Sequence, residues 1–199
     1  GSINVVTKRA ADVPLTRLTT TYMSRAQFGT HLDVGRRFGE ENQWGVRFNG
    51  VLRGGEGNID NGKQELGLGS LGLDYLGTRL RWSLDAVASK GDTREFRQQT
   101  SFAAGVTQIP EPPSARLNFY PGTRLEDNTK TVISRAEYDI NDSTTLYGSV
   151  GYTDFDYMQV FPSGRPDALG NFRVSNAYYH FFSKSTAADA GLRTRVKTR

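Results

Sequence analysis

Hydrophobic and polar side chains alternate along most of the chain, and the alternation is clearest over residues 64–89. From Leu80 to Ala88 every second residue is apolar, while the residues between them are mostly Arg, Ser or Asp. A period of two places alternate side chains on opposite faces of a β-strand. The preceding residues alternate in the same way up to a tight turn at residues 76–78. We therefore predict a β-hairpin here, with a β-bulge near Gly69, where the apolar phase shifts.

The same pattern predicts antiparallel strands along the whole chain, and no segment carries a helical period. A short strand near the start leads into a linker that ends at Pro14. A long segment over residues 98–128 carries Pro and Gly and predicts a loop. A polar turn over residues 183–186 separates the last two expected strands. The nine expected strands cover residues 15–24, 27–38, 44–53, 64–76, 80–97, 130–140, 144–160, 171–182 and 188–197.

The connections between these strands alternate in length. Short turns are expected at Gly39, Gly77, Asn141 and Ser183, and longer connections follow residues 54, 98 and 161. The Arg25-Ala26 connection is the exception, because it is short although it lies at the same end of the sheet as the longer connections. Short turns at one end of an up-and-down sheet and long loops at the other are typical of outer-membrane β-barrels.

Aromatic residues flank the short turns on the apolar phase of their strands. At a membrane interface, rings that are apolar with a polar edge are enriched. We therefore predict an all-β fold, an antiparallel up-and-down transmembrane β-barrel, present here as a partial barrel of about nine strands. A soluble sandwich or jelly roll is the alternative fold. The aromatic residues concerned are Phe38, Trp44, Tyr75, Trp82 and Tyr138.

Composition excludes several kinds of site. The 199 residues contain no cysteine, which rules out disulfides, thiolate metal sites and cysteine nucleophiles. The chain has 22 glycines, 9 tyrosines and 11 phenylalanines, which suits an aromatic-rich β protein. The formal charge of +4 is mild, and Lys and Arg are scattered along the strands, so we expect no nucleic-acid partner.

Three local motifs invite a chemical interpretation, and each has a simpler one. Residues 67–72 match the G-x-G-x-x-G pattern, but a strand and a turn follow where a nucleotide site needs a helix. His31 and His180 are the two histidines, and neither has a partner at ligand spacing. Asp154 and Asp156 could hold a hard cation, although a solvated strand face explains them better. We predict no catalytic residue, no metal site and no cofactor, and hence no enzyme.

The opening residues resemble a known family. The run Gly1-Ser2-Ile3-Asn4-Val5-Val6-Thr7-Lys8-Arg9 is similar to the end of the plug domain in TonB-dependent siderophore receptors, where the chain enters the barrel. The segments at residues 32–35, 44–50 and 134–147 look similar to the early barrel of the same family. The chain begins without Met, and we interpret it as part of a longer protein.

The resemblance implies a barrel of about 22 strands with a plug folded inside it. Residues 1–9 would be the last strand of the plug domain, and residues 10–199 the N-terminal part of the barrel. Such a protein is expected in the bacterial outer membrane, where it binds a ferric siderophore and imports it with energy from the TonB complex, reached through the plug. Outer-membrane lipid and lipopolysaccharide are the other expected partners. Iron would be cargo rather than a cofactor.

The long loops and the adjoining rim hold the candidate ligand-binding residues. Aromatic rings can pack on the apolar parts of a siderophore, and arginine can pair with an anionic chelate. Two other functions stay open at this stage, a small outer-membrane barrel enzyme or adhesin and a soluble carbohydrate-binding β-sandwich. The candidate residues are Arg97, Arg116, Phe119, Tyr120, Tyr157, Phe161 and Arg165.

Overall fold

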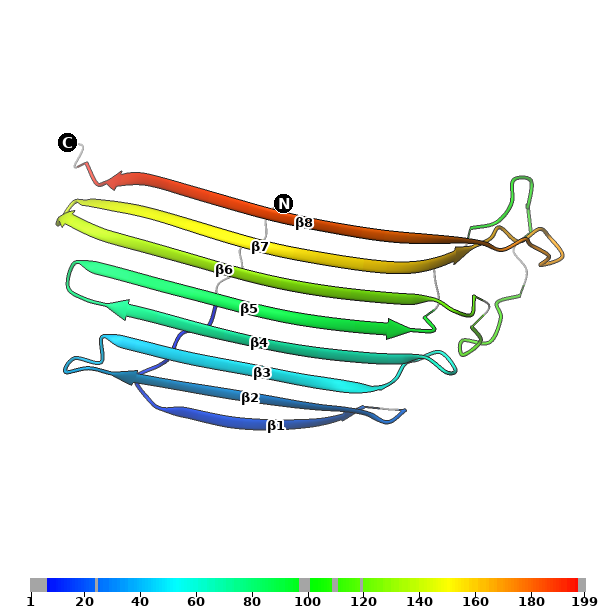
Figure 1. The fold of residues 1–199 in the computed structure, drawn as a ribbon, viewed down its shortest axis with the longest axis horizontal. Coiled ribbons are helices and arrows are strands. Elements are labelled where there is room, and N and C mark those ends of the chain that lie inside the picture. The colour runs from blue at the N-terminus through cyan, green and yellow to red at the C-terminus, as the bar shows by residue number, and fades with distance from the viewer. Residues whose placement is uncertain (1–6, 24, 97–100, 109–110, 119, 197–199) are drawn as a thin grey trace.

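A computed structural model describes residues 7–23, 25–96, 101–108, 111–118 and 120–196. Within them the chain forms one sheet of eight antiparallel strands in sequence order, each paired with the next (Figure 1). No pairing joins the first described strand to the last, so the sheet is an open part of a barrel. The strands are β1 Leu15–Met23, β2 Gln27–Phe38, β3 Trp44–Glu56, β4 Lys63–Leu76, β5 Leu80–Arg94, β6 Arg124–Asn141, β7 Thr144–Ser163 and β8 Ser175–Thr194.

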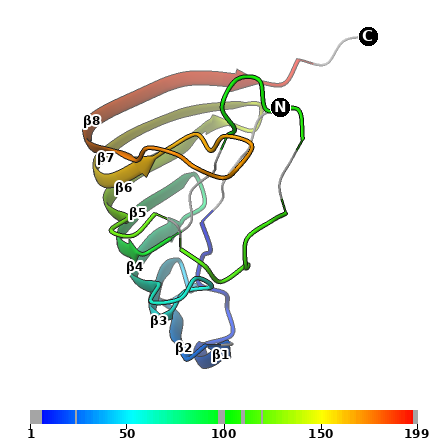
Figure 2. The same cartoon turned by 90° about the vertical axis from the view of Figure 1, so that its right-hand side faces the viewer.

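The sheet is curved, with an inner and an outer face. Seen from the side it forms an arc, and residues 7–14 lie on its concave side (Figure 2). The loops at the long-loop end also fold over that side. We call the concave side the inner face and the convex side the outer face. No second sheet is present among the described residues, so the sandwich alternative fails.

The outer face is apolar and largely uncovered. Leu52 on β3 is 71% exposed, and similar side chains recur at alternate positions of every strand. At the short-turn end the expected ring of aromatic residues is confirmed. The ring centroids of Trp44 and Tyr75 are 4.8 Å apart, and those of Trp44 and Trp82 are 6.3 Å apart. This apolar face with an aromatic edge is what a lipid bilayer covers.

The inner face carries the buried groups, and they are charged rather than apolar. Asp33, Asp74 and Asp85 are each at most 5% exposed. All three lie beneath or beside residues 7–10, which run across this face. The core of the chain is therefore polar, as expected for the interior of a membrane barrel.

Two expectations about the strands are wrong. The turn expected at residues 183–186 is absent, because β8 runs unbroken through them and pairs with β7 along its whole 20-residue length. The residues that the structure describes therefore form eight strands rather than nine. The bulge expected near Gly69 is also absent, since the register of β4 is continuous on both sides. Leu66 and Leu68 simply face inward.

The strands lengthen along the sequence. β1 has 9 residues, whereas β7 and β8 have 20 each. β6 begins at Arg124, six residues before the expected start, so the β5–β6 connection is shorter than predicted. A tilted strand needs about 9–11 residues to cross a membrane. The later strands therefore extend past the apolar band at the long-loop end. Among the described residues, no helix has the length and apolar character to cross a membrane.

Candidate functional site

Residues 7–10 are held against the inner face by a network of arginine–aspartate pairs. The Arg9 guanidinium donates to both carboxylate oxygens of Asp85, at 2.8 and 2.7 Å. Arg47 donates to both oxygens of Asp33 and, at 2.7 Å, to the backbone carbonyl of Arg9. Such two-pronged pairs fix direction as well as distance. They tie the segment to β2, β3 and β5.

A further pair closes this network at the short-turn side. Arg37 on β2 donates to the backbone carbonyl of Ala10 at 3.1 Å. Its Nη1 lies 2.8 Å from Oδ2 of Asp74 on β4, and both side chains are about 5% exposed or less. Removing one partner of such a buried pair is costly, because the other charge is left without compensation. The path of residues 9 and 10 is therefore specified by the barrel wall.

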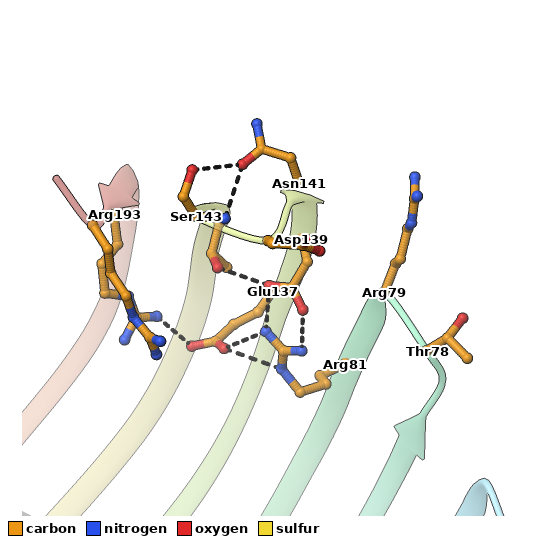
Figure 3. A pocket seen from close by; sticks show the side chains of 11 residues that line it. Thr78, Arg79, Arg81, Glu137, Asp139, Asn141, Ser143 and Arg193 are labelled. Carbon is orange, nitrogen blue, oxygen red and sulfur yellow. Dashed lines mark hydrogen bonds and ion pairs between the residues drawn. The ribbon is translucent and has the colours of Figure 1, made fainter. Parts of the chain in front are cut away.

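A second charged cluster lies at the short-turn end of β5–β8 and lines a hollow of about 550 Å³ (Figure 3). Arg81 bridges Asp139, at 2.6 Å, and Glu137, at 3.2 Å. Arg193 on β8 donates to the other oxygen of Glu137 at 2.9 Å. Thr145 Oγ1 donates to Asp139 at 2.7 Å. Arg81, Glu137, Asp139 and Arg193 each have a partner of opposite sign, and with Thr145 they tie β5, β6, β7 and β8 together.

At the long-loop end, one ion-pair cluster joins three connections. Asp60, between β3 and β4, accepts from Arg25 of the β1–β2 turn at 2.9 Å and from Arg116 of the β5–β6 segment at 3.0 Å. The hydrogen bonds from Arg25 and then Arg116 hold the pKa of the Asp60 carboxyl below its usual range. The cluster keeps these three connections together.

The β5–β6 segment packs on the β7–β8 connection through Tyr120. This ring is 1% exposed and lies 5.7 Å from the Phe172 ring, centroid to centroid. Its hydroxyl donates to the Gly164 carbonyl at 3.0 Å. Glu95 accepts from the Asn118 side chain at 2.7 Å and so closes the base of the segment. The described residues around Tyr120 therefore have a small core of their own.

Five aromatic side chains gather on the inner face of β7 and β8 near the long loops. The Phe155 ring lies 6.1 Å from Tyr157 and 6.0 Å from Phe181, and Phe161 lies 6.3 Å from Tyr179, between centroids. Phe181 and Tyr179 are both more than half exposed. We call Phe155, Tyr157, Phe161, Tyr179 and Phe181 the inner aromatic cluster. These rings form a partly exposed apolar surface on the concave side of β7 and β8.

The seven ligand candidates occupy different surroundings. Tyr157 and Phe161 belong to the inner aromatic cluster. Arg165 is exposed in the β7–β8 connection, close to them in sequence. Arg116 pairs with Asp60, and the ring of Tyr120 is covered by the loop. Arg97 and Phe119 lie outside the described residues.

Sequence reasoning missed three members of the cluster, Phe155, Tyr179 and Phe181. Phe155 could have been found, because it continues the alternation of Tyr157 and Phe161 on the same strand. Tyr179 and Phe181 lie in an expected strand whose facing is ambiguous from the sequence, because Tyr178 and Phe182 beside them are also aromatic. With β8 continuous, they fall on the inner face opposite Gln159 and Tyr157.

The two histidines have ordinary partners. His31 Nε2 lies 3.0 Å from the Asn49 side-chain oxygen on the inner face. His180 Nε2 lies 3.0 Å from Asp156 on the outer face. No group of three or more His, Cys, Asp or Glu side chains that could hold a metal ion occurs in the part of the chain that the structure describes.

Comparisons with known proteins give a consistent picture. No family model matches the chain. The chain is 39% identical to the ferrichrome receptor FcuA of Yersinia enterocolitica over 202 aligned residues, which cover 100% of this chain and 26% of the relative. The chain thus spans about a quarter of the length of that protein.

Solved structures agree on the fold. The ferric preacinetobactin receptor BauA of Acinetobacter baumannii superposes with a TM-score of 0.92 at 36% identity, over 97% of this chain and 29% of that one. The ferripyoverdine receptor of the Pseudomonas aeruginosa outer membrane superposes with a TM-score of 0.80 at 15% identity, over 93% of this chain and 25% of that one. The second match bears on the fold alone.

Proposed function

Because this chain is a segment of the TonB-dependent siderophore receptors, we propose that the full protein binds a ferric siderophore at the cell surface and imports it across the outer membrane. The observation that carries the proposal is the alignment of the whole chain, at 39% identity, with a receptor for a ferric chelate. The polar inner face and the apolar outer face agree with it, since a transport barrel needs a wet interior and a lipid-covered wall.

Within this chain we propose the inner aromatic cluster as the wall of the ligand site. Tyr179 and Phe181 are more than half exposed, and the other three residues of the cluster are partly exposed. The cluster lies on the parts of β7 and β8 nearest the long loops, which gather on the concave side (Figure 2). Arg165 follows Phe161 by four residues in the sequence and is exposed in the β7–β8 connection, outside the strands that form this wall. Tyr120 and Arg116 support the site indirectly, by holding the loops in place. The chelate passes through chemically unchanged, with iron as cargo.

We also propose that the network around Arg9 and Arg47 anchors the end of a plug domain. Residues 7–10 approach the wall from the concave side, where a plug would lie (Figure 2). The TonB complex would exert force on the plug. A fixed attachment to the wall would hold the end of the plug in place while the rest of it moves. Rearrangement of the plug would then take place upstream of residue 9.

The outer face suggests where lipid and lipopolysaccharide lie. Lys130 on β6 and Lys184 on β8 follow directly after the apolar band, and Asp154 of β7 lies between them in register. Lipid chains would cover the apolar band, and phosphates of lipopolysaccharide would meet the two lysines. Charges at this height attract anionic headgroups by about 1 kcal/mol each.

The experiment is growth under iron limitation. A strain lacking its own receptors would carry the full-length gene and receive a panel of ferric chelates one at a time. Rescue by one chelate, together with uptake of its radioactive iron that depends on TonB, is the expected result.

Two controls make the outcome decisive. A strain carrying an empty vector must not grow on the same chelate, and immunoblotting must locate the receptor in the outer membrane. Correct location without growth or iron uptake on any chelate would overturn the proposed function.

A further inference from the structure

The wall around the inner aromatic cluster is almost free of charge. Asp85 on β5 lies level, through the strand pairing, with Ile133 on β6, Gly151 on β7 and Ala187 on β8. Alternation along each strand then identifies the inward side chains between this level and the long loops. Beyond Asp85 itself, the one side chain among them that is charged at neutral pH is Asp127 on β6. These inward residues are Val87, Ser89, Gly91, Thr93, Leu125, Asp127, Thr129, Thr131, Ile133, Gly151, Thr153, Phe155, Tyr157, Gln159, Phe161, Ala177, Tyr179, Phe181, Ser183, Ser185 and Ala187.

The contrast with the rest of the chain is sharp. The inner face of β2 and β3 carries Arg37, Arg47 and Arg53, and the outer face of β5 and β6 at the same level carries Lys90 and Lys130. Cations are thus common elsewhere and absent from the inward positions of this patch. The Asp127 side chain lies over the backbone of Gly91, with one oxygen close to where a Cβ would stand. Its negative charge is therefore part of the inner surface of the wall.

From this distribution we infer that the β5–β8 wall accepts ferric chelates without net negative charge and discriminates against highly anionic ones. The inference rests on the proposed function and specifies its ligand class. Three hydroxamates carry one negative charge each and neutralise Fe³⁺, whereas three catecholates carry two each and leave a trianion. A trianion against this wall would lose water, meet the Asp127 carboxylate and find no cation among the inward side chains of these strands. A neutral chelate can pack on the rings and donate to or accept from the hydroxyl groups around them.

Binding to the full-length receptor in detergent tests the inference. Quenching of intrinsic fluorescence would be titrated with a neutral ferric tris-hydroxamate and, separately, with a trianionic ferric tris-catecholate. We expect the neutral probe to bind at least about tenfold more tightly, a difference of about 1.4 kcal/mol. Equal binding, or tighter binding of the trianion, would overturn the inference. Binding of neither probe to correctly folded receptor, with growth on another chelate, would also overturn it.

Two variants assign the preference to this wall. Ser183→Arg places a cation on the inner face directly opposite Phe155, and should reduce the preference for the neutral probe about tenfold. His180→Arg is the matched control, because it adds a cation three residues away on the same strand but on the outer face. The control should leave the ratio of the two affinities unchanged. If Ser183→Arg leaves the ratio of the two affinities unchanged, the selectivity resides in another part of the receptor and the inference fails.

A second pair separates ring contacts from charge. Phe181→Ala should weaken binding of the neutral probe about tenfold, whereas Phe182→Ala, its neighbour on the outer face, should leave binding unchanged. If Phe181→Ala has no effect, another part of the receptor covers the cluster and the inference fails. Failure of the proposed function itself looks different, since no ferric chelate of any charge would then bind or support growth.

Discussion

At the scale of single residues, the charged pairs on the inner face are the most consequential contacts in the chain. Asp85 is 5% exposed and has both oxygens occupied by Arg9. A hydrogen bond to a charged group contributes about 1.5–3 kcal/mol. Because Arg9 is partly exposed, the lower part of that range applies. The pair thus decides how firmly the segment before β1 is attached to the wall.

Asp85→Asn should loosen that attachment. The amide keeps one hydrogen bond to Arg9 but loses the charge, so residues 7–10 should exchange their amide hydrogens about tenfold faster in the full-length receptor. Hydrogen exchange read by mass spectrometry measures this. Asp189→Asn, on the exposed inner face of β8, is the control that should leave residues 7–10 unaffected. Unchanged exchange in the Asp85 variant would show that other contacts hold the segment.

The Asp60 cluster gives a prediction about pH. Arg25 and Arg116 lower the pKa of Asp60 below its ordinary value of 3.8, so its ionised form is favoured in the folded state. The stabilising effect is fully present above pH 3.8 and is lost as the pH falls through the lower, folded-state pKa. The amide of Asp60, which donates to the Arg116 carbonyl, should therefore stay equally protected from pH 7 to pH 5. Asp60→Asn should reduce its protection at pH 7, and a loss of protection already at pH 5 in the parent would contradict the sign.

At the scale of elements, the sequence predicted well wherever one face is apolar. The alternation of Trp82 and Leu84 with Arg81 and Ser83 specifies a two-faced strand, and it was enough to predict β2 to β5 and the aromatic ring. The alternation failed to predict the parts of β6 and β8 that lie nearer the long loops. There both faces are polar or aromatic, so residues such as Asp127 and Ser183 resemble turn residues, and only pairing with β7 shows that they belong to strands.

Contacts between loops were beyond the reach of the sequence for a different reason. Arg116 and Asp60 are 56 residues apart, and nothing local to either predicts that they meet. The same holds for Tyr120, whose exposure depends on Phe172 and Gly164. The aromatic content of the ligand wall was therefore predictable in part, and the occupied or buried state of the loop candidates was not.

The continuity of β8 can be tested with proline. Ser185 pairs with Thr153 in the middle of the β7–β8 ladder, and a proline there removes a backbone donor and constrains the strand. Ser185→Pro should lower the fraction of full-length receptor that folds in lipid vesicles, as judged by the mobility of unheated samples in gels. Ala168→Pro, in the β7–β8 connection, is the control and should fold normally. Normal folding of Ser185→Pro would favour a turn at this point.

At the scale of the whole molecule, the chain is one open sheet whose outer face needs lipid and whose two edge strands have backbone groups facing outward. β1 pairs with β2 alone, and β8 pairs with β7 alone, among the described residues. Unpaired edges join other edges readily. The division of charge follows the same geometry, with paired ions inside, rings and aliphatic side chains outside, and loops tied together above.

The 199-residue segment should therefore self-associate when it is produced alone in detergent. We expect broad, concentration-dependent oligomers by size-exclusion chromatography with light scattering, whereas the full-length receptor should be uniform. Placing a proline in this edge strand, by Thr20→Pro in β1, should reduce the association. A sharp monomer peak for the parent segment would mean that β1 and β8 close on each other in the isolated chain.

The growth in strand length from β1 to β8 has a consequence for the cell surface. The short turns share one end, and there β1 starts opposite Gly35, three residues before β2 ends at Phe38. About eight of the eleven extra residues of β8 therefore lie at the other end, where they add roughly 25 Å of strand, about seven tenths of which becomes height if the strand tilts by about 45°. The rim of the receptor is thus a slope, low beside β1 and standing well clear of the membrane beside β8. Small solutes can reach the inner face past the shorter strands beside β1. Among the described strands, the β7–β8 end therefore stands highest above the membrane, where a large molecule such as an antibody would contact it before β1.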